Sequence, residues 1–315
     1  MLNAFFKARP RLRVALLGLA ICAPSMAVGV SAALAQDAAR LTAPATTSFV
    51  SDRLSVEVIG QGPDVILIPG FGCSREVWRV TAERLKATHR VHLVQLAGFA
   101  GEPWTHGDGA FVQPVVDELD RYAQTQGLER PALVGHSMGA LVGLVLAQQH
   151  PDAISRLMSV DSLPFFGALR GPQLTVEAMR PAAEQTAQSL LTLSDDAFRA
   201  AQVGSAQGMT RDPALRERLV DWTTGSDRRA MASAMRDVLL TDARPGLAAM
   251  TTPVTVLYAA DADGGAPAAQ ADQAWTSQYA PLPGAKLVRI DGSRHFIMAD
   301  QPERFAQALD AFLAD

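Results

Sequence analysis

The sequence predicts an α/β fold in which helices cover both faces of a mostly parallel sheet, with one helical insertion. Two observations lead to this prediction. Short apolar runs alternate with segments of helical spacing, and one long stretch, 163–250, has helical patterns without a strand pattern. Strands that alternate with helices imply parallel pairing through right-handed crossovers. The insertion follows the carboxyl end of a strand, where open α/β sheets bind ligands, so we expect it to cover a site there.

The N-terminal 35 residues have the three regions of an export signal. Several basic residues precede an apolar run, 14–30, and Ala33-Leu34-Ala35 forms a small-residue cleavage site. We therefore expect a signal peptide over 1–35 and a periplasmic or secreted protein that begins at Gln36. An uncleaved anchor is the alternative, and Pro24 within the apolar run disfavours it. Residues 36–52, rich in Ala and Thr, are expected to be a flexible lead-in.

Composition excludes several classes of partner. Lys and Arg number 28 against 32 Asp and Glu, so the net charge of −4 does not favour nucleic acid or an anionic membrane. Removal of the signal leaves Cys73 as the only cysteine, so the mature chain has no internal disulfide. We expect a small-molecule substrate, no nucleic-acid partner and no stable membrane association once the signal has been cleaved.

The remaining elements follow in chain order. An edge strand of alternating polarity, 54–58, precedes a fully apolar buried strand, 65–68. Strand and helix patterns then alternate as far as the terminal helix, and they predict helices at 75–87, 111–122 and 302–313 and strands at 91–96, 157–161, 254–258 and 286–291. The core is therefore expected to comprise 53–162 and 251–315, with a helical cap formed by 163–250.

A nucleophile elbow is predicted where the apolar run 131–134 turns into the next helix pattern. The sequence there is Gly135-His136-Ser137-Met138-Gly139, the G-x-S-x-G pattern. Its glycines are needed because side chains would clash where strand and helix pass closely. Ser137 is expected to be exposed at the end of the strand, beside a helix N-terminus that favours an anionic oxygen.

A serine nucleophile needs a histidine as base and a carboxylate that orients the histidine. Among the six histidines, His295 alone lies in a loop directly after the last predicted strand, in the chain order expected of this elbow. For the acid we favour Asp261, after the strand 254–258. Asp263 and then Asp161 are the alternatives, and each of the three carboxylates could instead be a helix cap or turn residue.

The oxyanion that forms during acyl transfer needs two backbone donors. The elbow supplies the amide of Met138, and the loop after the second strand supplies the amide of Phe71. Cys73 lies in the same loop, but nothing pairs it with a base. This chemistry requires no metal or organic cofactor.

From residue 53 onward the chain resembles the capped proteins of the α/β-hydrolase fold. The resemblance depends on the elbow and on three loops: Pro69-Gly70-Phe71-Gly72, the acid loop after 254–258, and Gly292-Ser293-Arg294-His295-Phe296. It implies a serine hydrolase that cleaves a carboxylic ester, or less favourably an amide, through an acyl-enzyme. Two positions depart from the family pattern. Pro69 replaces the usual His of the oxyanion loop, and Ala262 stands where the family's spacing places the acid, so all three Asp candidates stay open.

Three rival functions would use the same fold: carbon–carbon bond hydrolysis, acyl transfer to an alcohol, and binding without catalysis. The cap is expected to be a mobile lid that selects substrates without taking part in the chemistry. Phe165 and Phe166 at its start are expected at the hinge or in an acyl pocket, although an aromatic pair can also be plain core.

Overall fold

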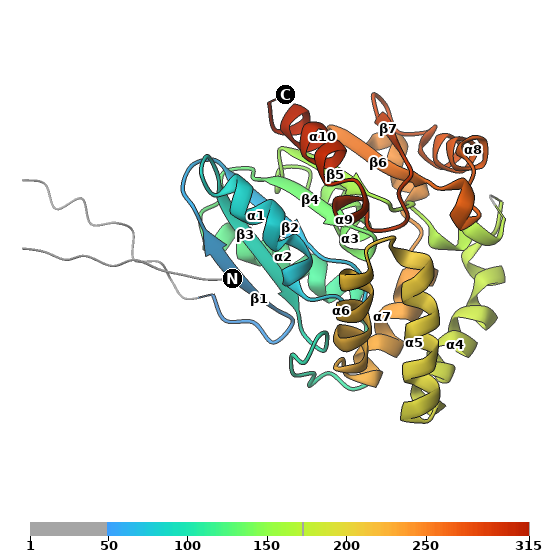
Figure 1. Ribbon diagram of the computed structural model, residues 1–315. Helices are drawn as coiled ribbons and strands as arrows, with labels where there is room; N and C mark the ends of the chain where they lie inside the picture. The colour runs from blue at the N-terminus through green and yellow to red at the C-terminus, as the bar shows by residue number, and fades with distance from the viewer. Residues whose placement is uncertain (1–48, 172, 315) are drawn as a thin grey trace, which may run out of the picture. The chain divides into compact units, whose positions relative to one another are not determined.

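A computed structural model describes residues 49–171 and 173–314 (Figure 1). The expected signal peptide over 1–35 lies outside the described residues, as does most of the lead-in. Among the residues that the structure does describe, no helix has the length and apolar character needed to cross a membrane.

The described chain forms a seven-stranded sheet in the order β1-β3-β2-β4-β5-β6-β7. β1 pairs with β3 in the antiparallel direction, and every other neighbouring pair is parallel. The mostly parallel sheet predicted from the sequence is therefore confirmed. The strand bounds are β1 Leu54–Ile59, β2 Asp64–Ile68, β3 Arg90–Leu96, β4 Ala132–His136, β5 Arg156–Val160, β6 Val254–Ala260 and β7 Lys286–Asp291.

Helices cover both faces of the sheet, because strand side chains alternate between two buried clusters. Ile66 and Ile68 of β2 point to one cluster, and Val65 and Leu67 point to the other. The first face is covered by α2 (Val112–Thr125), α3 (Met138–Gln149) and α8 (Ala268–Tyr279), and the second by η1 (Arg75–Trp78), α1 (Arg79–Leu85) and α10 (Pro302–Ala314).

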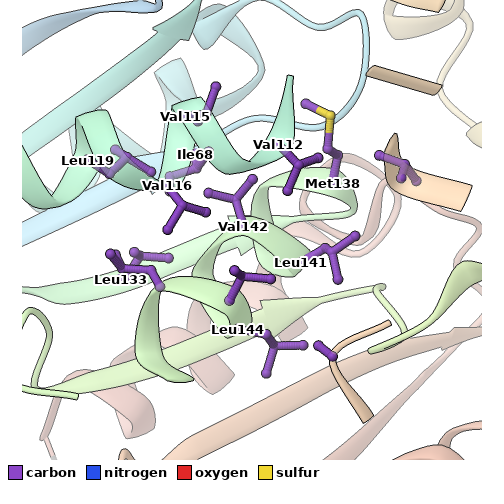
Figure 2. Packing of buried hydrophobic residues seen from close by; sticks show 14 of the residues in the cluster. Ile68, Val112, Val115, Val116, Leu119, Leu133, Met138, Leu141, Val142 and Leu144 are labelled. Atoms are coloured by element: carbon purple, nitrogen blue, oxygen red, sulfur yellow. The ribbon is translucent and has the colours of Figure 1, made fainter. Parts of the chain in front are cut away.

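The packing of α2 on α3 shows how the sequence pattern produces the core (Figure 2). The apolar side chains of α2 recur at helical spacing, so they form one stripe that faces α3 and the sheet. Full burial of one such side chain contributes about 1.5–3 kcal/mol to the stability of the fold. The buried members of this contact are Val112, Val115, Val116 and Leu119 of α2, Leu141, Val142 and Leu144 of α3, and Ile68 and Leu133 of the strands.

All regular elements described between β5 and β6 are helices, and 163–171 and 173–250 contain no strand. Each of the four α-helices in this stretch is preceded by a serine, threonine or aspartate that caps it. The capping side chain accepts a hydrogen bond from a helical amide two or three residues further along the chain. Figure 1 shows these four helices grouped together. The elements are η2 (Phe166–Arg170), α4 (Val176–Thr192), α5 (Asp195–Met209), α6 (Pro213–Thr224), α7 (Arg228–Leu240) and η3 (Arg244–Ala249). We refer to 163–250 as the cap.

Candidate active site

Ser137 occupies a strained turn between β4 and α3. Its backbone has φ 52° and ψ −120°, which is unusual for a residue with a side chain and costs about 1–3 kcal/mol. The surrounding structure holds this conformation, since the Ser137 amide donates to the Val160 carbonyl at 2.9 Å. A Cβ on Gly135 would lie 2.5 Å from the Gly139 carbonyl oxygen, and a Cβ on Gly139 would lie 2.5 Å from that of Ile68. The predicted steric need for both glycines is thereby explained.

His295 lies in the loop 292–296 after β7, which we call the histidine loop. Its Nδ1 lies 2.7 Å from Oδ2 of Asp161, the residue directly after β5. Asp161 is 8 % exposed, and its Oδ1 accepts a hydrogen bond from the Ala259 amide at 2.9 Å. A carboxylate held in this way orients the imidazole and leaves Nε2 as the free ring nitrogen.

The choice of Asp261 as the partner of His295 is therefore wrong. Asp261 follows β6 and is buried, but its carboxylate accepts hydrogen bonds from Arg211 and, at 3.0 Å, from Nε of Arg294. Asp263, the second choice, has a side chain that is 82 % exposed and that pairs with Arg211 at 3.1 Å. Asp161, the third choice, is the carboxylate that contacts the imidazole.

Sheet order explains why the acid comes from the earlier strand. β5 lies between β4, which leads to Ser137, and β6, so a side chain at the end of β5 is next to the elbow. Asp161 has φ 48°, and its amide donates to the Leu257 carbonyl of β6 at 2.7 Å. This turn brings its carboxylate to β6, where Oδ1 accepts from the Ala259 amide and Oδ2 contacts His295.

His136 has a structural role that the sequence analysis missed. Its Nε2 lies 3.0 Å from the carbonyl oxygen of His295, and a carbonyl can only accept, so Nε2 carries the proton. Its Nδ1 has no hydrogen-bond partner among the described residues. Burial, with the nearby His295, holds the pKa of His136 well below its ordinary value, so the ring stays neutral. Its neutral ring anchors the backbone of the histidine loop. The other strand histidine, His92, is buried, and its two ring nitrogens contact the Tyr122 hydroxyl and the Asp64 carboxylate.

The predicted oxyanion donors lie in two segments next to Ser137, the first turn of α3 and the loop after β2. Met138 is the first residue of α3, so its amide has no acceptor within the helix. Gly70 is pressed against the elbow, because a Cβ there would lie 3.2 Å from the Cβ of Ser137. Phe71 follows it, and Phe71 and Met138 line the same cavity as Ser137. The assignment of Phe71 and Met138 as oxyanion donors stays a prediction that this arrangement favours.

Cys73 also lines this cavity, yet its environment is unsuited to nucleophilic chemistry. Its side chain is buried, and burial raises the pKa of the Cys73 thiol to about 12. The thiol is therefore protonated at neutral pH and a weak nucleophile.

A cavity of about 580 Å³ lies between the sheet and the cap and contains both Ser137 and His295. Its lining is largely apolar and, among the described residues, includes no Asp, Glu, Lys or Arg. The cap supplies most of the apolar wall, including Phe166, Leu169, Leu190, Met209, Leu219, Met235, Val238 and Leu239.

The model of one protein family, described as the alpha/beta hydrolase family, matches residues 65–308. The chain belongs to this family. The predicted resemblance to the fold and the prediction of a hydrolase enzyme are thereby confirmed.

Curated relatives carry a common description. A pimeloyl-[acyl-carrier protein] methyl ester esterase of Vibrio vulnificus is 26 % identical over 264 residues, which cover 84 % of this chain and 99 % of the relative. Another protein of that description, from Vibrio atlanticus, is 35 % identical over 125 residues, which cover 40 % of this chain and 46 % of the relative.

Solved structures support the same fold. The enol-lactonase from Burkholderia xenovorans is similar with a TM-score of 0.68 at 19 % identity, covering 83 % of this chain and 96 % of that chain. A thermophilic esterase from Thermogutta terrifontis has a TM-score of 0.69 at 22 % identity, covering 83 % of this chain and 93 % of that chain. These similarities concern the architecture alone.

The two phenylalanines at the start of the cap of this hydrolase have different surroundings. Phe166 lines the cavity, in keeping with an acyl-pocket residue. Phe165 is fully buried and lies outside the cavity lining. Its ring packs against Gly167, and Cζ of the Arg244 guanidinium lies 4.4 Å from the ring centroid. Of the alternatives for Phe165, a place in the acyl pocket is therefore wrong, and the core alternative fits its full burial.

Replacement of these two residues by Ala should accordingly have different effects. Phe166→Ala enlarges the cavity, so we expect the preferred acyl length to increase in a panel of esters, with little change in stability. Phe165→Ala should reduce the free energy of unfolding by about 3–5 kcal/mol and leave the chain-length profile of the folded fraction unchanged. Denaturant unfolding curves measure the free energy of unfolding, and the ester panel measures the preferred acyl length. An unaltered profile in Phe166→Ala would remove this residue from the pocket.

Proposed function

We propose that this chain is an exported serine esterase that cleaves carboxylic esters with an apolar acyl group through an acyl-enzyme on Ser137. The observation that supports it most directly is the 2.7 Å contact between His295 and Asp161 at a cavity that also contains Ser137. The curated relatives, described as methyl ester esterases, support an ester as the substrate class.

In the acylation step, the Ser137 hydroxyl oxygen attacks the carbonyl carbon of the ester and its proton passes to Nε2 of His295. Asp161 stabilises the imidazolium that forms. The carbonyl oxygen becomes negatively charged, and the amides of Phe71 and Met138 stabilise it. Each such donor is worth roughly 10²–10³-fold in rate. The tetrahedral intermediate then expels the alcohol, which takes the proton from His295.

In the deacylation step, a water molecule attacks the acyl-enzyme while His295 accepts its proton. The same two amides stabilise the second oxyanion, and Ser137 leaves with the proton that His295 returns. The cycle releases a carboxylic acid and needs no further cofactor.

The cavity lining supports an uncharged, apolar acyl group. A charged group placed there would lose its hydration without a charged partner on the lining residues, which is energetically costly. Apolar acyl carbons would instead contact side chains such as Leu190, Leu219 and Val238.

A fluorophosphonate probe tests the nucleophile, and a panel of nitrophenyl esters of increasing acyl length tests the substrate class. We expect labelling at Ser137 alone and a preference for medium or long uncharged acyl chains over chains that end in a carboxylate. A binding protein without catalytic activity would not react with the probe. Labelling without ester turnover would favour acyl transfer or carbon–carbon cleavage instead.

Export is part of the proposal because of the basic, apolar and small-residue regions in 1–35. When the full chain is expressed in a bacterium with a periplasm, we expect the recovered protein to begin at Gln36. Intact mass of the periplasmic and culture fractions measures this. A species that retains Met1 in the cytosol would contradict the prediction, and an Ala35→Arg variant, in which cleavage should be blocked, is the control.

A further inference from the structure

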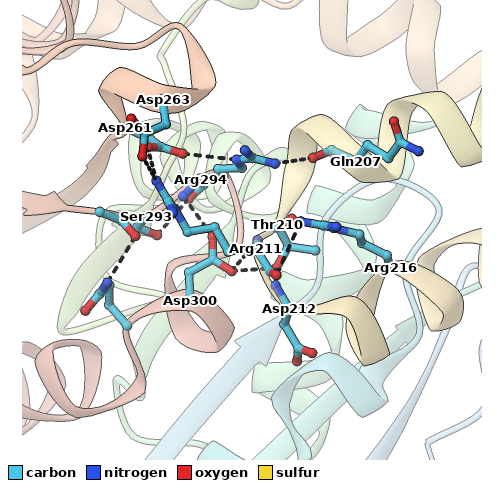
Figure 3. A network of polar contacts seen from close by, with 12 residues as sticks. Gln207, Thr210, Arg211, Asp212, Arg216, Asp261, Asp263, Ser293, Arg294 and Asp300 are labelled. Carbon is cyan, nitrogen blue, oxygen red and sulfur yellow. Dashed lines mark hydrogen bonds and ion pairs between the residues drawn. The ribbon is translucent and has the colours of Figure 1, made fainter.

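The segment 207–212, which comprises the end of α5 and the connection to α6 in the cap, lies directly against the histidine loop (Figure 3). The Phe296 amide donates to the Met209 carbonyl at 3.2 Å. Arg294, the residue before His295, donates through Nη1 to the Gln207 carbonyl. The cap therefore contacts the backbone and side chains on both sides of His295.

Two carboxylates from the core join the same two segments. Asp261 accepts a hydrogen bond from Arg211 of the cap on one oxygen and from Arg294 of the histidine loop on the other. Asp300 accepts from the Arg294 amide at 2.8 Å, from the Arg211 amide at 2.8 Å and from the Thr210 hydroxyl at 2.5 Å. We call these five residues, Thr210, Arg211, Asp261, Arg294 and Asp300, the clamp; all of them are labelled in Figure 3.

The clamp is partly buried, so its charges depend on one another. Asp261 is 4 % exposed and Thr210 is fully buried. Burial raises the pKa of Asp261, but the hydrogen bonds from Arg211 and Arg294 outweigh it and hold the pKa below its ordinary value. A buried carboxylate that loses one of its two partners is left with uncompensated charge, so movement of Arg211 is resisted.

We infer that the clamp makes the cap a positioning element of the catalytic histidine. Arg211 and Thr210 of the cap fix Asp261 and Asp300, and these carboxylates fix Arg294 and thereby the backbone that presents His295 to Ser137. This inference rests on the proposed function. It replaces, for the segment 207–212, the expectation that the cap only selects substrates, because opening of this segment would break hydrogen bonds on both sides of His295.

Arg211→Met tests the inference, with Arg199→Met as the matched control, since Arg199 is an exposed arginine of α5 outside the clamp. We expect kcat for a short nitrophenyl ester to fall about tenfold in Arg211→Met, because a small displacement of a catalytic group strongly reduces the rate. The kcat is expressed per Ser137 site titrated with a fluorophosphonate, which corrects for unfolded protein. KM should change less than twofold. Arg211→Lys should restore part of the rate, and Arg199→Met should match the wild type.

Asp261→Asn and the double variant with Arg211→Met show whether the residues act as a unit. A clamp predicts that the double variant loses about tenfold, as each single variant does, because the second change removes a contact that is already broken. A hundredfold, additive loss would overturn the inference, as would an Arg211→Met variant whose kcat per titrated site stays within twofold of wild type. Should Asp261→Asn fail to fold, Thr210→Val in combination with Arg211→Met provides the second cycle.

A proton NMR measurement separates failure of the clamp from failure of the esterase proposal. The Nδ1 proton that His295 shares with Asp161 should give a low-field resonance, which the His295→Gln variant identifies by its loss. We expect this resonance to broaden or shift in Arg211→Met and to stay unchanged in Arg199→Met. If wild type is neither labelled nor active, the esterase proposal fails while this resonance still tests the clamp. If the resonance in Arg211→Met is the same as in Arg199→Met and wild type, the inference that the clamp positions His295 is wrong.

Discussion

Ser137→Ala should lower kcat/KM for the preferred ester by at least about a thousandfold, because it removes the attacking oxygen from an otherwise intact site. The change is small and removes no packing, so circular dichroism and the denaturation midpoint should stay close to wild type. Labelling by a fluorophosphonate should disappear.

Ser277→Ala is the matched control, since Ser277 is an exposed serine of α8 that does not line the cavity. This variant should retain at least about half of the wild-type activity, as is usual for a substitution away from buried or catalytic features. Substantial activity in Ser137→Ala, beyond about a hundredth of wild type, would remove Ser137 from the mechanism.

Asp161→Asn should lower kcat by roughly 10³–10⁴-fold, which is the second largest effect that we expect. An asparagine keeps the oxygen that accepts from the Ala259 amide, so the turn after β5 should survive. Its NH₂ group, however, faces the imidazole and favours the tautomer with the proton on the wrong nitrogen of His295. Steady-state kinetics, corrected by active-site titration, measures the loss.

Two other aspartates complete the comparison. Asp261→Asn should cost about tenfold through the clamp, and the largely exposed Asp263 should be replaceable by Asn with almost no effect. The three carboxylates are therefore ranked by their distance from His295 along the network of contacts. A larger loss in Asp261→Asn than in Asp161→Asn would reverse the assignment of the acid.

Most strands and core helices were predictable because their signals are local. The alternation of polarity in β1, the unbroken apolar run of β2 and the apolar stripe of α2 each depend on residues a few positions apart. The helix expected over 75–87 is instead a 3₁₀ turn followed by α1, which ends at Leu85. Boundaries of this kind depend on how the loop between β2 and α1 packs, which periodicity does not describe.

The cap shows the same division between local and tertiary information. Its helical content follows from spacing and from N-capping residues such as Thr175 and Asp227. Which cap side chains would face the cavity did not follow, and the neighbouring Phe165 and Phe166 point to different environments. The direction of each side chain depends on how η2 packs on the helices of the cap.

The sequence by itself determined the elbow at Ser137 and singled out His295 as the histidine expected beside it. A strand-to-helix turn with positive φ requires glycines at fixed positions, and His295 is the one histidine directly after the last strand, so both could be assigned from short stretches of chain. Only the tertiary structure decided between Asp161 and Asp261. Both follow a strand at the same edge of the sheet, and their roles depend on which partners lie within hydrogen-bond distance: the Ala259 amide and His295 for Asp161, and arginines from two distant segments for Asp261.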